Sequence, residues 1–551
     1  MKPSPVEKIK KESNGLRGNI KEGLSNDLSG AISDADMQVI KFHGIYLQDD
    51  RDRREERAEK KLERLYSFMV RLRLPGGVLN AAQWMASHHI AGEFSTGVIK
   101  ITTRQTLQLH GLLKSDIKPT LQAFNAVNLD SIATCGDINR NVAAASHPFQ
   151  SKLHEEIHGY AQNISERLMP KTRAWYDIWL DEEQLLDKKE EEDHLYQDRY
   201  LPRKFKIGIA IPPNNDVDVF TNDIGLIAIE EDGKLAGFNI AIGGGLSQTH
   251  GNPETYPRLA TVIGFVQAGE PTFKAIYEVL TIQRDYGNRS DRKLARLKYT
   301  VDTYGIAWWK TELGKRMGFA LEPERSYSFT ARRDYYGWQQ GQNGLWYYTV
   351  FVENGRVTDD EKCAVKSGLY AIAQTGKTQF RFTSNQNVIV ADVAEKDKAA
   401  IHLLLEEFGI ANQTEHASAL HLNGMACVAF NTCPLALAEA QRYLPSLLDK
   451  MDVLLKKYNL DKEEIIIRMT GCPNGCARSV AAEIGFIGTA YGMYNVHIGG
   501  DREGYRLNTK YLESQDEAQI LATFNKLFEK FSVEKNLAES FGDFVHRVKI
   551  V

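Results

Sequence analysis

The chain contains two related copies of one sequence pattern, and this duplication constrains its fold more than any other feature. Three segments recur in the same order along the chain, with apolar positions matched and several residues identical. The pairs are VIKITTRQTLQL (98–109) with QFRFTSNQNVIV (379–390), IPPNNDVDVFTNDIG (211–225) with GCPNGCARSVAAEIG (471–485), and FNIAIGG (238–244) with YNVHIGG (494–500). An amphipathic helix is expected after each copy of the first segment, at 118–129 and 395–408. The pattern predicts a two-copy α+β protein with pseudo-two-fold symmetry, and not a solenoid.

Size and charge narrow the class of protein. The 551 residues are 42% hydrophobic, which is enough to bury the cores of several domains. The net charge of −4 argues against a nucleic-acid coat or a polybasic membrane binder. No apolar run is long enough to span a bilayer, and the first residues, MKPSPVEKIKKESNG, have no apolar core of a signal peptide. We therefore expect a cytoplasmic protein.

Two polar regions are expected to lie outside the globular core. Residues 1–40 are rich in Gly, Ser and Asp, which predicts partial disorder or an arm that lies on a partner. The mixed-sign run 49–64 is typical of a solvated helix or extended arm, and the run 187–199 of a charged linker.

Four of the six cysteines fall in one stretch, as Cys427-x5-Cys433 followed by Cys472-x3-Cys476. Two close pairs can supply four thiolates to an iron–sulfur cluster or to a tetrahedral zinc ion. The five-residue spacing is longer than a zinc knuckle, so the pattern favours a [4Fe–4S] cluster over zinc or over unreactive buried thiols.

Only one copy carries this cysteine pair. Where the second copy has C-x3-C, the first has Pro212 and Asp216. The sequence therefore predicts two related halves with one live metal site. Cys135 and Cys363 stand apart from the other cysteines and are expected to be ordinary buried residues.

Basic residues gather in four short polar segments. They are Arg71 and Arg73; Lys204 and Lys206; Lys100, Thr102 and Arg104; and Asn139, Arg140 and Asn141. Alternation on a strand places alternate side chains on one face, so each pair of cations is expected to point the same way. For any one segment alone, a half-exposed strand with its cations pointing outward is the favoured interpretation. Together they indicate an anion or polyanion site, because gathering like charges is costly without one.

The cysteine motifs also resemble those of a known family. MACVAFNTCPLALAEA (425–440) and TGCPNGCARS (470–479) are similar to the paired motifs of the sulfite/nitrite reductase haemoproteins, above all the bacterial assimilatory sulfite reductases. The resemblance runs from FHGIYLQDDRD (42–52) to ESFGDF (539–544). It implies a [4Fe–4S] cluster joined through the Cys476 thiolate to the iron of sirohaem, within three mixed α/β domains around a central cofactor site.

The resemblance also implies a division of the chain. The expected parts are an N-terminal arm (1–64), a paired ferredoxin-like repeat domain (65–145 with 325–420), a first sirohaem-binding domain without cluster ligands (146–324), and a second sirohaem- and [4Fe–4S]-binding domain (421–551).

Site residues follow by the same resemblance. The substrate cations are expected to be Arg71, Arg140, Lys204 and Lys206; the sirohaem contacts Lys100, Arg104, Gln108, His110, Asn474 and Cys476; and the cluster ligands Cys427, Cys433, Cys472 and Cys476. Lys100 stands where relatives have arginine, which keeps the charge but loses the two-pronged contact with a carboxylate.

The implied activity is the six-electron reduction of sulfite to sulfide in sulfur assimilation. The alternatives are an assimilatory nitrite reductase with the same cofactors, and a non-enzymatic iron–sulfur electron carrier, against which the cationic segments argue. No G-x-G-x-x-G motif opens a helix after a strand, so electrons must come from outside the chain. The N-terminal arm resembles that of enzymes whose donor is an NADPH-oxidising FAD/FMN flavoprotein; ferredoxin is the alternative donor.

Overall fold

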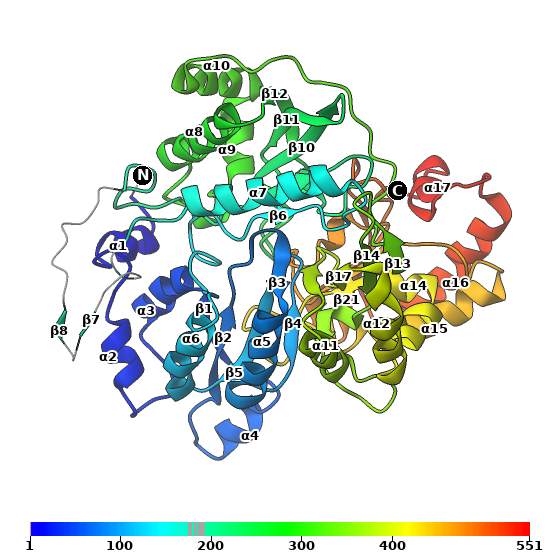
Figure 1. The fold of residues 1–551 in the computed structure, drawn as a ribbon, viewed down its shortest axis with the longest axis horizontal. Helices are drawn as coiled ribbons and strands as arrows, with labels where there is room; N and C mark the ends of the chain where they lie inside the picture. The colour runs from blue at the N-terminus through cyan, green and yellow to red at the C-terminus, as the bar shows by residue number, and fades with distance from the viewer. Residues whose placement is uncertain (1, 173, 175–178, 181–182, 185–192) are drawn as a thin grey trace.

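The computed structural model describes residues 2–172, 174, 179–180, 183–184 and 193–551 (Figure 1). Its strands form four five-stranded sheets and a short hairpin of β7 (Trp179–Leu180) with β8 (Glu183–Gln184). The first part of the predicted charged linker, up to residue 192, lies outside the described residues.

Two of the sheets have matching topology and exchange one strand. The first has the order β1 (Ile45–Asp49), β2 (Tyr66–Arg71), β5 (Leu107–Leu112), β4 (Ile99–Ile101) and β15 (Arg356–Val357). The second has the order β13 (Gly337–Gln340), β14 (Trp346–Val350), β17 (Val388–Val393), β16 (Gln379–Phe382) and β3 (Val78–Asn80). Each sheet is completed by an edge strand from the other copy, so the two copies form a single unit.

The other two sheets also share one topology. One contains β6 (Ala143–Ala144), β9 (Ile207–Ala210), β10 (Ile224–Glu231), β11 (Lys234–Ile242) and β12 (Thr261–Gln267), and the other β18 (Gly424–Ala426), β19 (Ile467–Thr470), β20 (Ile484–Ala490), β21 (Met493–Ile498) and β22 (Thr509–Gln515). In both, the first three strands are parallel and the last two antiparallel. The order and directions of the strands confirm the predicted duplication.

Helices cover these sheets and complete three hydrophobic cores (Figure 1). The strand-exchanged unit carries α5 (Ala81–Phe94), α6 (Ile117–Asn125), α11 (Val365–Gln374), α12 (Glu395–Glu407) and α13 (Ile410–His416). The third sheet carries α7 (Ser151–Arg167), α8 (Glu270–Tyr286), α9 (Leu297–Tyr304) and α10 (Ile306–Met317). The fourth carries α14 (Ala419–Leu422), α15 (Leu444–Lys457), α16 (Glu517–Glu534) and α17 (Phe541–Arg547). The expected helices after the first repeat are confirmed as α6, which ends earlier than predicted, and α12.

The N-terminal residues are folded onto the rest of the chain, so the prediction of partial disorder for residues 1–40 is wrong over 2–40. They form α1 (Pro5–Lys11), α2 (Ile20–Ser25) and α3 (Asp34–Val39), and α4 (Arg54–Glu59) lies in the predicted charged run. Leu16 and Val39 join a hydrophobic core. Lys10 is buried because Glu7 and Asp137 neutralise it, at 2.6 and 3.4 Å from its Nζ. A polar composition can therefore hide a packed segment when its charges are paired.

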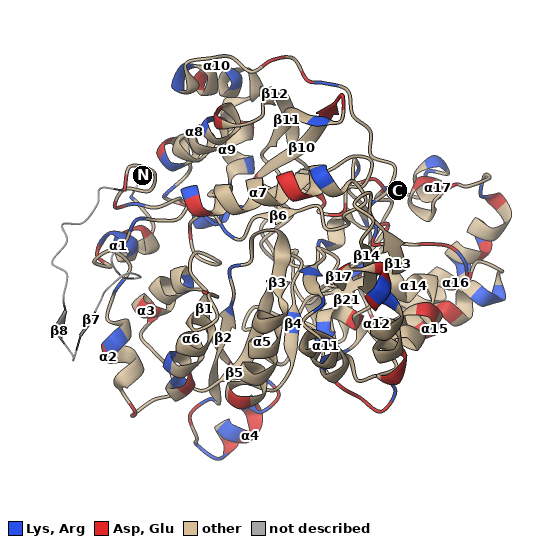
Figure 2. Ribbon diagram, in the orientation of Figure 1, with Lys and Arg blue, Asp and Glu red and all other residues tan. Residues whose placement is uncertain are grey.

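Charges on the outer helices are mixed in sign. Figure 2 shows acidic and basic residues interspersed along α8 and α16. Among the described residues, no helix is both long enough and apolar enough to cross a membrane.

Candidate cofactor and substrate site

One internal cavity lies where the two copies face each other. It is lined by Thr103 and Arg104 from the β4–β5 turn, by Lys204 and Lys206 before β9, by Val217, Thr221 and Asn222 before β10, by Leu246 and Ser247 after β11, by Arg296 before α9, and by Asn474, Gly475, Cys476 and Arg478 after β19. Cations of the first copy thus face the cysteine loop of the second copy across one space.

The four clustered cysteines come from two loops that follow neighbouring parallel strands. Cys427 follows β18, and Cys472 follows β19. Because these two strands are parallel neighbours, their carboxyl ends lie at the same edge of the sheet, and the two cysteine loops start side by side. The Gly471 N–H donates to Cys427 Sγ at 3.4 Å, and Asn474 Nδ2 donates to Cys472 Sγ at 3.3 Å. Such donors stabilise thiolate sulfur and tune the metal that it binds.

The pKa values of the clustered thiols are raised by burial and by the charge of neighbouring thiolates. Burial raises the pKa of Cys427 well above its usual value, and the nearby Cys476 raises it further. Burial, with Cys476 next, raises the pKa of Cys433 to about 12. A cationic group is needed to hold such thiols together as thiolates. Among the described residues, no group of three or more His, Cys, Asp or Glu side chains is placed to hold a single metal ion.

Three cations on the opposite wall make no ion pair with a carboxylate among the described residues, although the terminal nitrogens of one of them, Arg104, donate to Asn222, Asn141 and Ile207. Burial, with Lys206 next, lowers the pKa of Lys204 well below its usual value. Burial together with Arg104 and Arg296 lowers the pKa of Lys206 to about 7. Among the described residues, no side-chain hydrogen bond occupies either ammonium group, and Arg104 Nε is buried without an acceptor. These groups fit a polyanion with several carboxylates, together with a small anionic substrate.

Arg71 and Arg140 lie beside this wall, and Arg71 contacts Cys135. Arg71 donates to Cys135 Sγ at 3.1 Å. It also donates through Nε to the side-chain amide oxygen of Gln108 at 2.7 Å, when the Gln108 amide is oriented with its oxygen toward the guanidinium group. Arg140 donates to the carbonyl of Gly136 at 3.2 Å. Cys135 is buried, as expected, and its sulfur accepts a hydrogen bond from one predicted substrate cation, Arg71. Cys363 lies in a hydrophobic core, as expected.

Arg73 does not share the site with Arg71. Strand β2 ends at Arg71, and Arg73 makes a bidentate pair with Asp130 at 3.0 and 2.6 Å. The predicted alternation of both arginines on one strand face is therefore wrong.

Lys100 and His110 lie on the side of the cysteines rather than in the cavity lining. Lys100 is buried beside Cys427 and donates to the carbonyl of Asn354, and burial lowers its pKa to about 7. His110 Nδ1 is 2.9 Å from Gln48 Oε1 and 3.5 Å from Thr432 Oγ1. Burial lowers the pKa of His110 to about 3, so its ring is neutral.

Among the cavity residues that sequence reasoning missed, three bear on its charge and hydrogen bonding. Arg296 pairs with Asp223 at 2.8 Å, Asn222 Oδ1 accepts from Arg104 at 2.6 Å, and Arg478 lines the cavity two residues after Cys476. Arg296 lies in ARLKYT, whose alternating cations repeat the pattern that singled out Lys204. That alternation could have found it.

Family models match both kinds of sheet. The nitrite/sulfite reductase ferredoxin-like half domain matches residues 61–127 and 338–408, the two strand-exchanged copies. The nitrite and sulphite reductase 4Fe-4S domain matches residues 159–321, a stretch without cysteine.

Full-length relatives carry one name. The "Sulfite reductase [NADPH] hemoprotein beta-component" of Leptospira biflexa is 57% identical over 550 residues, covering 100% of this chain and 99% of the relative. Its namesake from Bacillus subtilis is 49% identical over 550 residues, covering 100% and 96%. The solved structure of the Mycobacterium tuberculosis NirA protein has the same fold, with a TM-score of 0.79 at 24% identity over 99% of this chain and 97% of that one.

Proposed function

Because the chain belongs to the nitrite and sulphite reductase family, we propose that it catalyses the assimilatory six-electron reduction of sulfite to sulfide. The family and its relatives support one sirohaem and one [4Fe–4S] cluster as cofactors. The observation that carries the proposal is the cavity itself, in which Lys204, Lys206 and other cations of one copy face the cysteine loop of the other. A simple electron carrier needs no such anion site.

The residues divide between the two cofactors. Cys427, Cys433, Cys472 and Cys476 would hold the cluster, with Cys476 as the thiolate shared with the sirohaem iron. Lys100, Arg104, Gln108, His110 and Asn474 would hold the sirohaem. When bound, the two cofactors supply electrons to the sulfur of sulfite.

The substrate anion would be bound and retained by four cations, Arg71, Arg140, Lys204 and Lys206. Their positive charges stabilise negative charge on the sulfite oxygens, and a cation whose pKa lies near neutrality can also give up a proton. Lys206, with its pKa lowered to about 7, is suited to hold a proton at Nζ and release it as an oxygen leaves as water.

Electrons would come from a separate protein. The names of the full-length relatives include NADPH, which supports an NADPH-oxidising FAD/FMN flavoprotein subunit as the donor and makes ferredoxin the alternative. Four clustered thiols are also suited to a reducing compartment, and we place the enzyme in the cytoplasm.

The test is steady-state reduction of sulfite and nitrite, side by side, with each donor. We expect the larger kcat/KM for sulfite and for the flavoprotein donor. A larger kcat/KM for nitrite would instead make the chain an assimilatory nitrite reductase. A purified protein with cluster absorption but without the bands of an isobacteriochlorin haem would overturn both.

A further inference from the structure

Asp218 and Arg478 occupy the same position in the two copies and form an ion pair between them. Each precedes a short 3₁₀ helix, Val219–Thr221 (η5) in the first copy and Ser479–Ala481 (η8) in the second. Both have left-handed backbones, with φ of 49° and 57°. Arg478 Nε lies 2.7 Å from Asp218 Oδ2. The two copies therefore meet through opposite charges at equivalent points.

Asp218 also binds two more guanidinium groups. Arg332 NH1 donates to its Oδ1 at 2.8 Å, and Arg468 NH1 to its Oδ2 at 2.7 Å. Asp218 is only 1% exposed, and its three arginines are buried as well. Although burial alone raises the pKa of Asp218, the three guanidinium groups hold it well below its usual value. We call these four residues the Asp218 cluster.

The cluster joins segments that are far apart in the sequence. Arg332 donates to the carbonyls of Ala481 and Asp501 at 2.7 and 2.9 Å, and Arg478 to the carbonyl of Ser384 at 2.6 Å. Through its arginines, the buried Asp218 carboxylate thus connects the end of the cysteine loop with Ser384 of the ferredoxin-like unit and with Ala481 and Asp501 of the fourth sheet's domain. No other anion in the cluster compensates the three arginines.

Cys476 depends on such anchors for its position. It is the most exposed of the six cysteines, and no side-chain hydrogen bond to its sulfur is found among the described residues. Its loop is held by backbone contacts: Thr103 Oγ1 donates to the Cys476 carbonyl at 3.1 Å, and the Arg478 N–H donates to the Gly475 carbonyl at 3.1 Å. A shift of Arg478 therefore changes the backbone of the loop that carries Cys476.

We propose that Asp218 is a positioning residue for Cys476, which fixes the direction of its thiolate through Arg478. This inference rests on the proposed function, because it takes Cys476 as the link between cluster and sirohaem. Asp218 itself does not line the cavity. Its removal leaves Arg71, Arg140 and Lys204 in place, so it should alter the link and not the binding of sulfite.

The test is Asp218→Asn in the holoenzyme, with kcat expressed per bound sirohaem. Misplacement of a reacting group by about 1 Å can cost on the order of 100-fold, so we expect kcat to fall about 10- to 100-fold while KM for sulfite stays within about twofold. The haem absorption spectrum should also shift, because the iron's thiolate is displaced. Unchanged kcat per sirohaem and an unchanged spectrum would overturn the proposal.

A matched control separates positioning from general destabilisation. Asp285 on α8 also binds three arginines, Arg199, Arg284 and Arg316, at 3.4, 2.8 and 2.9 Å, and it lies outside the cavity lining. Asp285→Asn should lower thermal stability without changing kcat per sirohaem or the spectrum. An equal loss of kcat in both variants would reduce Asp218 to a structural role.

If Asp218→Asn does not fold, Arg478→Lys carries the test. It keeps the charge but loses the contact with the Ser384 carbonyl, so it should lower kcat with KM unchanged. Where both variants fold, the double variant should be no worse than the more severe single one, because both act through one link. Additive losses would overturn the proposal. Failure of the wild-type enzyme to reduce sulfite would instead overturn the proposed function, and the spectral comparison would still test the positioning role.

Discussion

Replacing Lys206 with methionine should stabilise the cofactor-free polypeptide while it destroys activity. Burial with Arg104 and Arg296 lowers the pKa of Lys206 from 10.5 to about 7, so folding with a charged Lys206 is penalised. Each pKa unit is worth about 1.4 kcal/mol, which makes about 4–5 kcal/mol an upper limit. Lys206 is partly exposed, so solvent screens part of this penalty, and we expect Lys206→Met to raise the free energy of unfolding by about 2 kcal/mol at pH 7.

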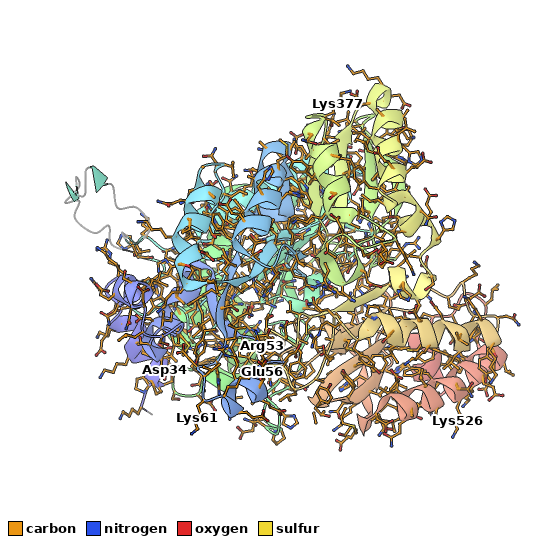
Figure 3. All side chains as sticks on the ribbon, turned by 90° about the horizontal axis from the view of Figure 1, so that it is seen from below. Asp34, Arg53, Glu56, Lys61, Lys377 and Lys526 are labelled. Carbon is orange, nitrogen blue, oxygen red and sulfur yellow. The ribbon has the colours of Figure 1, made fainter. Side chains whose placement is uncertain are left out.

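The pH dependence gives this prediction its sign. Between pH 7 and 10.5 the unfolded chain binds a proton at Lys206 that the folded chain has released, so wild-type stability rises with pH over that interval. The advantage of Lys206→Met should therefore shrink as the pH is raised from 7 to 10. Urea denaturation of cofactor-free protein at several pH values measures both effects. Lys526→Met on α16, an exposed lysine (Figure 3), is the control and should change neither. A variant less stable than wild type at pH 7, or a difference that does not vary with pH, would refute the reasoning.

Three further predictions concern the same site and its supports. Cys476→Ser should abolish sulfide production in the donor-coupled assay, and full activity would contradict its role as the shared thiolate. Asp223→Asn leaves the buried Arg296 without its carboxylate, and urea denaturation should show a loss of about 3–5 kcal/mol; a loss below 1 kcal/mol would contradict the pairing. Gly77→Ala places a Cβ 2.8 Å from that of Gln105 at a φ of +76°, so the same measurement should show a loss of about 1–3 kcal/mol, and a neutral result would contradict the tight packing at this turn.

The duplication was readable because it preserves motifs that a single chain displays twice. Strands β4 and β16 fall inside the first repeated pair, and Pro213 and Pro473 mark the turns of the second. Alternation also identified Lys204 and Lys206 as cations on one wall. These features are local in sequence, and local spacing determines them.

Features that depend on contacts between distant segments could not be predicted in this way. The exchange of β3 and β15 involves very short edge strands whose partners lie in the other copy. The burial of Lys10 depends on Asp137, and the position of Arg478 on Asp218. A charged residue looks solvated until the carboxylate that neutralises it is known, and pairing across such distances leaves no periodic signal.

The two copies keep one architecture but differ in charge where chemistry is at stake. When the two copies are aligned by their strand registers, Lys204 of the first copy corresponds to Glu464 of the second. In the same alignment, Arg140 corresponds to Leu422. Glu464 is already neutralised by Arg333 at 2.6 Å, in an open groove that Leu422 also lines. Equivalent positions in the two copies therefore carry a lysine and an arginine in one copy, and a paired glutamate and a leucine in the other. The fold on both sides is the same, so the difference between the copies at these positions is one of side-chain chemistry and not of architecture.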